Sequence, residues 1–176
     1  EVGLKAINIG VEGGNEEFRR DVLNRKYADD VIIESIHEAK KSGVNVGANV
    51  IIGFPGETRQ HVFETINIIR EAQPTSTMIH LFQPYAKTEL RDRCVQMGLI
   101  SDEYICGDYR MHAIGTGYLS SEEILGLQRT FNLYVDMPKN NWNEIRLAEK
   151  FNNNGNRIFK KLAKQYQMKK FNKTSF

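Results

Sequence analysis

The chain has 176 residues, of which 40% are hydrophobic and 26% charged, and its formal net charge is +2. This length suits one domain, and the composition excludes a disordered or fibrous protein. No apolar run approaches the roughly 20 residues of a membrane span and no signal-peptide pattern opens the chain, so we expect a cytoplasmic protein. Two cysteines, Cys94 and Cys106, are too few for a disulfide framework or a cysteine-only metal site, and we expect no metal ligands in this sequence.

The small net charge hides an asymmetry along the chain. Residues 139–176 carry ten Lys or Arg residues and two Glu, whereas residues 1–138 carry 14 basic and 20 acidic residues. A basic tail is compatible with binding to nucleic acid or to another anionic surface. A solvated helix also explains such a segment, and the tail lacks the aromatic residues interleaved with basic ones that single-strand binders use.

Three strand-then-helix units are predicted in succession. We expect strands at 5–11, 46–52 and 77–82, and helices that begin after Asn15, at 29–42, after Thr58 and at 88–97. The strand at 46–52 is apolar almost throughout, as in a strand buried on both faces. Successive units of this kind, about 30–40 residues long, favour a parallel sheet with helical crossovers. The predicted fold class is therefore α/β.

The part of the chain after residue 100 is predicted to be mainly helical. We expect a strand around 109–114, a helix from Ser120 or Ser121 to Tyr134, and two basic helices near 142–150 and 156–169. Glu123 lies in the first turn of the helix that ends at Tyr134, as in a capping box. The predicted division is a β/α part at 1–100 and a basic helical extension at 101–176.

Polar and glycine-rich segments follow all three predicted strands, where ligands of α/β sheets bind. At the first end, Glu12 offers a carboxylate to ribose hydroxyls or an amine, and its neighbouring glycines let a ligand approach the backbone. At the second end, 53–56 forms a tight turn before a helix N-terminus. At the third end, 82–85 offers backbone groups to the edge of a flat base. We expect these ends to form one continuous wall of a pocket.

Several common active-site motifs are absent. Without a GxGxxG or a phosphate-binding Lys loop, a dinucleotide or nucleoside triphosphate site is not indicated. The four histidines show no ligand spacing and are expected to be structural, and no serine elbow occurs. Cys94 lies on an apolar helix face and is expected to be a small core residue. Each strand-end feature taken alone also fits an ordinary turn or loop acid.

The ordered series of strand ends resembles a known family. It is similar to the second half of a radical S-adenosylmethionine (radical SAM) domain over about residues 4–100. The resemblance rests on the segments 10–14 (GVEGG), 22–26 (VLNRK), 49–58 (NVIIGFPGET), 83–90 (QPYAKTEL) and 97–100 (MGLI). It implies a partial (β/α) barrel of six strands, of which this chain supplies the last three. Residues 129–135, with Pro138 and Trp142, resemble the C-terminal extension of cobalamin-binding radical SAM proteins, the subgroup that the chain resembles most.

The resemblance implies roles for nine residues in holding S-adenosylmethionine. Those at the first strand end would contact its ribose or methionine part, a basic residue its carboxylate, and the other strand ends its adenine. In that order they are Glu12 with Gly13, then Arg25, then Asn49, Ile51 and Gly53, and finally Phe82, Gln83 and Tyr85. Two departures matter: Gly13 replaces a usual serine and removes a hydroxyl, and Ala86-Lys87 replaces a usual Pro-Gly.

The CxxxCxxC motif that holds the family's 4Fe–4S cluster is missing, as is the strand-two acidic motif. Cys94 and Cys106 are twelve residues apart and lie in the wrong half, so the cluster ligands are expected upstream. The resemblance implies a fragment whose partner is the missing N-terminal half of the barrel. In the intact enzyme, the cluster would cleave S-adenosylmethionine to a 5′-deoxyadenosyl radical that modifies an unknown substrate, for example in methyl transfer with cobalamin.

By itself the chain is expected to be inactive and to expose the open edge of its first strand, which favours aggregation. Two other interpretations stay open. One is a stand-alone α/β module that binds a nucleoside, or nucleic acid through the tail. The other is an inactive remnant of such an enzyme.

Overall fold

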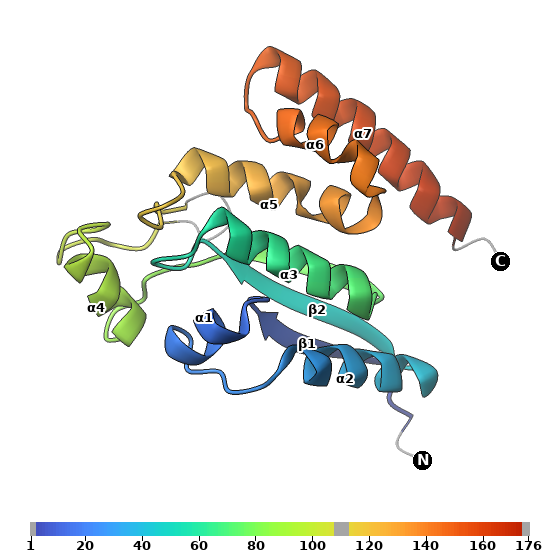
Figure 1. Ribbon diagram of the computed structural model, residues 1–176, viewed down its shortest axis with the longest axis horizontal. Helices are drawn as coiled ribbons and strands as arrows, with labels where there is room; N and C mark the ends of the chain where they lie inside the picture. Colours follow the sequence, from blue (N-terminus) through green and yellow to red (C-terminus); the bar gives the residue numbers. More distant parts are fainter. Residues whose placement is uncertain (1–2, 108–112, 174–176) are drawn as a thin grey trace.

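The computed structural model describes residues 3–107 and 113–173, the last five of these by their backbone (Figure 1). Strands and helices alternate in the first part of the chain, and helices follow one another in the second. The elements are β1 (Ala6–Glu12), α1 (Glu16–Asp21), α2 (Asp29–Lys41), β2 (Asn45–Ile52), α3 (Arg59–Ala72), β3 (Ser76–Leu81), α4 (Glu89–Gln96), α5 (Ser121–Asp136), the 3-10 turn η1 (Lys139–Asn141), α6 (Trp142–Ala148) and α7 (Asn153–Lys173).

The three strands form one parallel sheet in the order β1-β2-β3, which confirms the predicted α/β class. Asn49 in the central strand pairs with Gly10 on one side and with Met78 on the other. The register of β1 shifts between Gly10 and Glu12, so the last residue of β1 leaves the regular pleat. Within the described residues, β1 pairs only with β2, and its outer edge is open as predicted.

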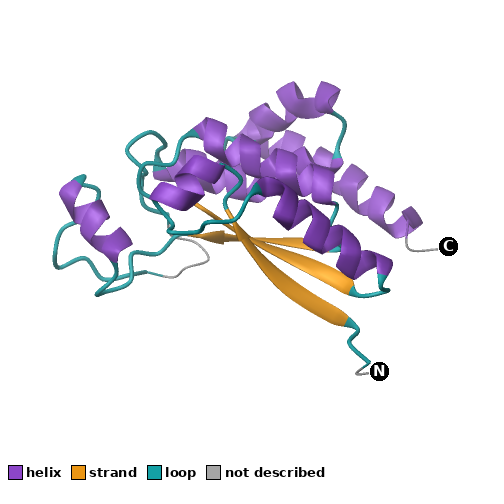
Figure 2. Cartoon of the chain, turned by 60° about the horizontal axis from the view of Figure 1, so that its bottom comes forward, coloured by secondary structure: helices purple, strands orange, loops and turns teal. Residues whose placement is uncertain are grey.

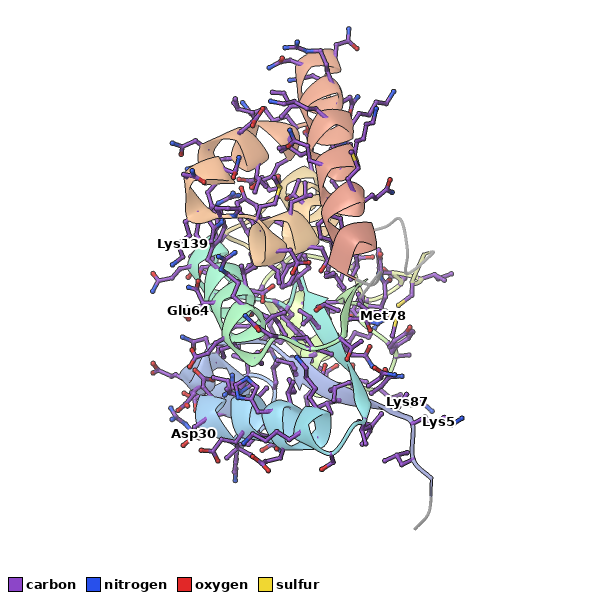
Figure 3. The ribbon with its side chains drawn as sticks, turned by 90° about the vertical axis from the view of Figure 1, so that its right-hand side faces the viewer. Lys5, Asp30, Glu64, Met78, Lys87 and Lys139 are labelled. Atoms are coloured by element: carbon purple, nitrogen blue, oxygen red, sulfur yellow. The ribbon has the colours of Figure 1, made fainter. Side chains whose placement is uncertain are left out.

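Helices cover one face of this sheet. Figure 2 shows the helices on one side of the strands, with the opposite side of the sheet uncovered in the described part of the chain. Helices α2 and α3 lie against β2, α5 lies against α3 and β3, and α6 and α7 form the outermost layer (Figure 1). Figure 3 shows Asp30 and Glu64 on the helical side and Met78 on the other side.

The prediction that the second strand is buried on both faces was wrong. The residues of β2 that point toward the helices are fully buried: Val46, Ala48, Val50 and Ile52. On the other face, Asn49 and Ile51 are only partly buried, because none of the described helices forms a layer against them. One face of the sheet therefore carries the core, and the other is available to a ligand or another segment.

The predicted helix starts are confirmed by their capping contacts. Asn15 Oδ1 accepts a hydrogen bond from the Phe18 amide at 2.7 Å. Ser120 and Glu123 form the expected capping box, with Glu123 Oε2 accepting from the Ser120 amide at 2.9 Å. Thr58 caps α3 in the same manner, and the His61 ring accepts from the Thr58 amide. Each cap satisfies an amide that the helix itself leaves unpaired.

The helices after residue 100 share a core with the sheet. One cluster of buried side chains runs from β2 through α3 and α5 to Leu162 on α7. The Glu149 carboxylate strengthens this contact, because it accepts from Arg59 at 2.5 Å and from the Tyr134 hydroxyl at 2.5 Å. The domain boundary at residue 100 stays a prediction.

Two further observations concern the second half of the chain. Most of the strand predicted around 109–114 lies outside the described residues, and Ala113 and Ile114 are not in a strand. Among the described helices, none is both long and apolar enough to cross a membrane.

The loop between β1 and α1 approaches the backbone of α3 at Gly14. A Cβ atom at Gly14 would lie 2.3 Å from the Thr65 Cα, well inside contact distance. The Gly14 amide donates to Thr65 Oγ1 at 2.7 Å across this contact. The absence of a side chain at Gly14 therefore allows α3 to pack against this loop. The sequence had suggested that it allows a ligand to approach.

Gly14→Ala is expected to lower the free energy of unfolding by about 3 kcal/mol or more, because backbone must move to admit the methyl group. Urea unfolding followed by circular dichroism measures this loss. Gly13→Ala is the matched control, because a Cβ there meets nothing closer than Leu23 Cδ1 at 4.0 Å. Equal stability of the two variants would contradict the steric account.

Candidate functional site

The carboxyl ends of the three strands border one cleft of about 390 Å³ on the helix-free face. Its walls come from all three strand ends, from the segment after α1 and from the start of α4. The lining residues are Glu12, Leu23, Arg25, Ile51, Phe54, His80, Leu81, Phe82, Gln83, Tyr85, Thr88 and Leu90. The three strand ends thus form one wall, as the sequence led us to expect.

Six of the nine residues predicted to hold a cofactor line this cleft: Glu12, Arg25, Ile51, Phe82, Gln83 and Tyr85. Three do not line it. Gly13 is buried, and its carbonyl accepts from Arg19 at 2.8 Å. Gly53 is buried in the turn after β2. Asn49 lies on the same face of the sheet as the cleft, two residues before Ile51, which lines it. The cofactor contacts of all nine stay predictions.

Glu12 is held in an unusual backbone conformation at the end of β1. Its φ angle is +61°, in the left-handed region that non-glycine residues seldom adopt. This turn brings its carboxylate back over the sheet, because a Cβ at Gly10 would lie 3.0 Å from Glu12 Oε1. The absence of a side chain at Gly10 therefore leaves room for the acid on the open face. Strained residues of this kind cluster at ligand sites.

The two arginines near the first strand end have different environments. Arg25 is exposed and lines the cleft, where its guanidinium is free to meet an anion. Arg19 is fully buried and donates to the carbonyls of Gly13 and Tyr27 and to Asp29 Oδ1, the last at 2.6 Å. It joins the β1–α1 loop to the start of α2. Sequence analysis missed Arg19, since nothing in the helical pattern distinguishes a buried arginine from a solvated one.

Aromatic side chains form the floor of the cleft. The Phe54 ring lies 5.2 Å from the Phe82 ring and 6.3 Å from the Phe18 ring, between centroids. These rings pack with Cys94 in a second apolar cluster beneath the strand ends. Burial raises the pKa of the Cys94 thiol to about 11, so Cys94 is an unreactive core residue, as predicted.

The turn after β2 is closed by a buried carboxyl group that sequence analysis did not single out. Glu57 Oε2 accepts from the Gly53 amide at 2.6 Å, and Gly53 has a φ of +91°. Burial raises the pKa of Glu57 to about 8, although hydrogen bonds from the Gly53 and Phe54 amides favour the carboxylate. The carbonyl of Glu57 accepts from Thr116 Oγ1 at 2.7 Å, which ties the turn to the loop before α5.

Two polar groups on the open face add to the site. His80 is exposed and lines the cleft opposite Ile51, so it is available to a ligand. Asn49 Oδ1 is buried and has no hydrogen-bond partner among the described residues. A buried acceptor of this kind calls for a donor from a ligand, water or another segment.

In contrast, His61 is structural, as predicted. It caps α3, and the centroid of its ring lies 4.9 Å from the centroid of the Phe18 ring.

The described residues contain no group of three or more His, Cys, Asp or Glu side chains that could hold a metal ion. Cys94 is buried in the apolar cluster, and Cys106 Sγ donates to the Pro84 carbonyl at 3.3 Å. Neither thiol is arranged to ligate a cluster.

Comparison with known proteins agrees with this architecture. Residues 1–80 match the model of the Radical SAM superfamily, which confirms the predicted resemblance over this part of the chain. The three parallel strands and the cleft at their carboxyl ends lie within or next to the matched residues.

The names of the curated relatives refer to the modification of transfer RNA. Threonylcarbamoyladenosine tRNA methylthiotransferase MtaB of Bacillus subtilis (strain 168) is 36% identical over 83 residues, which cover 46% of this chain and 18% of that protein. The tRNA-2-methylthio-N(6)-dimethylallyladenosine synthase of Corynebacterium diphtheriae is 30% identical over 104 residues, which cover 56% of this chain and 20% of that protein. The chain thus spans a fifth or less of the length of these relatives. None of these names mentions cobalamin, and the predicted closeness to cobalamin-binding proteins finds no support in them.

Glu57→Gln is expected to flatten the dependence of stability on pH. Because the pKa of Glu57 is about 8 in the folded protein against an ordinary 4.5, the folded state retains a proton that the unfolded chain releases. The contribution of Glu57 to stability therefore falls as pH rises from about 4.5 to about 8, by up to about 1.4 kcal/mol per pH unit.

Urea unfolding at a series of pH values measures this difference between wild type and Glu57→Gln. The glutamine can still accept from the Gly53 amide, so the turn is preserved. Glu17→Gln, at an exposed position of α1, should follow the wild-type slope. Parallel curves for wild type and Glu57→Gln would show that the buried carboxyl group is ionised.

Proposed function

We propose that this chain is the S-adenosylmethionine-binding second half of a radical SAM barrel, in an enzyme whose cluster-bearing half lies outside this sequence. The observation that carries the proposal is the cleft at the ends of β1, β2 and β3, whose lining residues lie within or next to the segment that matches the Radical SAM superfamily. Ligands of parallel α/β sheets bind at that end of the strands.

The groups in the cleft suit the parts of S-adenosylmethionine. Glu12 is an acceptor for the amine or the ribose hydroxyls, and Arg25 offers the donors that match a carboxylate. Phe82 and Tyr85 supply apolar surface beside a purine, and the buried Asn49 Oδ1 calls for a donor on the same face. The chain's own residues would thus hold and orient the cofactor and exclude water from it.

The open side of the sheet supports a partner within the same barrel. The edge of β1 has unpaired backbone groups, and the face opposite the helices is uncovered in the described part of the chain. Both features suit a further parallel strand and the rest of a barrel wall. When bound beside a reduced 4Fe–4S cluster, S-adenosylmethionine supplies a carbon-centred radical that takes hydrogen from a substrate.

The relatives' names link them to modification of transfer RNA by a methylthio group. Transfer of a one-carbon or sulfur-containing group is accordingly the reaction class that we propose for the intact enzyme. Cobalamin is not part of this proposal.

Glu12→Gln and Arg25→Gln are each expected to weaken S-adenosylmethionine binding by roughly 10- to 100-fold, because each removes one charged hydrogen-bonding partner. Isothermal titration calorimetry of the chain with S-adenosylmethionine measures the change. The matched controls are Glu17→Gln and Arg20→Gln, which alter the same charges on the exposed face of α1 outside the cleft. A wild-type chain that does not bind, or an equal loss in the controls, would refute the proposal.

Anaerobic reconstitution of the isolated chain with iron and sulfide is expected to yield no cluster, since neither Cys94 nor Cys106 is placed as a ligand. Visible absorbance and iron analysis after gel filtration provide the measurement. The double variant Cys94→Ser/Cys106→Ser should behave like wild type. One 4Fe–4S cluster per chain, lost in the double variant, would show that the cluster is held within this sequence.

A further inference from the structure

Helix α7 differs from the other helices in its charge. It is 21 residues long and carries seven Lys or Arg residues with no Asp or Glu. Helix α2, by comparison, has Asp29 and Asp30 in its first turn and an ion pair between Lys41 and Glu38. Surface helices of soluble proteins usually mix both signs, and a single-sign face produces a field that attracts a partner of opposite charge.

The inner face of α7 is fixed to the body of the protein. Leu162 is fully buried, and Ile158, Phe159 and Tyr166 pack against the main core. The Arg129 guanidinium of α5 lies 4.5 Å from the centroid of the Phe159 ring. Because this apolar face is occupied, α7 presents its outer face as a rigid platform.

The outer face carries a row of three cations that have no acidic partner among the described residues, although Arg157 donates a hydrogen bond to Asn154 Oδ1 at 3.1 Å. Arg157, Lys160 and Lys164 follow one another at a spacing of three and four residues, which places them on one side of the helix. All three are exposed, and none forms an ion pair with another described residue. Lys161 beside them is different, because it pairs with Glu144 of α6 at 2.7 Å. The row is therefore a positive surface that no acidic side chain of the described residues neutralises.

Exposed amide side chains flank this row. They are Asn153 and Asn154 at the start of the helix and Gln165 and Gln167 near its end. Amides donate and accept hydrogen bonds, and in nucleic-acid complexes they contact phosphates, sugar hydroxyls and base edges. Cations with flanking amides therefore suit a chain of phosphates and sugars.

We infer that the outer face of α7 binds the phosphate backbone of RNA. A membrane surface suits it less well, because interfacial helices insert an apolar face, and the apolar face of α7 is buried. Three cations alone would attract an anionic bilayer only weakly. This surface lies outside residues 1–80 and in the layer of the molecule farthest from the sheet, as Figures 1 and 3 show. The inference is therefore independent of the S-adenosylmethionine site.

The test is the binding of the full chain to a fluorescein-labelled single-stranded RNA of mixed sequence, followed by anisotropy over a series of salt concentrations. The triple variant Arg157→Gln/Lys160→Gln/Lys164→Gln removes the row while keeping good helix-forming residues. It is expected to weaken binding on the order of 100-fold at about 0.1 M salt and to reduce the slope of log K against log salt by about 2.

The matched control is Lys5→Gln/Arg20→Gln/Lys41→Gln, which removes the same charge from exposed positions just before β1, on α1 and on α2. The control should bind RNA like wild type, and both variants should keep wild-type circular dichroism and wild-type affinity for S-adenosylmethionine. Absence of wild-type binding, or equal losses in the two variants, would overturn the inference. Sedimentation of the chain with phosphatidylserine vesicles, without binding to RNA, would also overturn it.

Discussion

In the described part of the chain, helices cover only one face of the sheet, and the other features of the structure depend on that constraint. On the covered side, four apolar residues of β2 are removed from water and begin a core that extends to α7. On the open side, the alternation of the same strand presents Asn49 and Ile51. Burial of one face provides the stability, while the other face remains free to form the cleft and to meet further strands.

Two buried ionisable groups keep the strand ends in place. The Arg19 guanidinium satisfies carbonyls of the β1–α1 loop, and the Glu57 carboxyl group satisfies the Gly53 amide in the turn after β2. Irregular backbone that is buried needs such partners, because an unpaired amide or carbonyl is costly away from water. Neither group lines the cleft, yet together they hold the segments that carry Glu12, Arg25 and Phe54. A site whose supporting shell is rigid binds its ligand with less loss of entropy.

The charge asymmetry of the sequence becomes a separation in space. The cleft, with one acid and one arginine, lies at the strand ends, whereas the cationic row of α7 lies on the outermost layer. Arg59 and Glu149 link these parts by an ion pair, with Glu149 nearly buried. The basic helices are thus joined to the sheet through a shared core, so a partner held on α7 would be presented in a fixed relation to the cleft.

Local pattern in the sequence determined the order of the elements, the caps at Asn15, Thr58 and Ser120, and the position of the strand ends, because apolar period and capping chemistry involve near neighbours. The quoted motifs also sufficed to indicate the radical SAM superfamily. Only the tertiary structure decided which face of β2 is open and that α3 packs against Gly14. It also decided that Arg19 and Glu57 are buried and that His80 lines the cleft. Each of these depends on contacts between residues far apart in the chain, such as Gly14 with Thr65 and Glu57 with Thr116, and such contacts leave no periodic signal in the sequence.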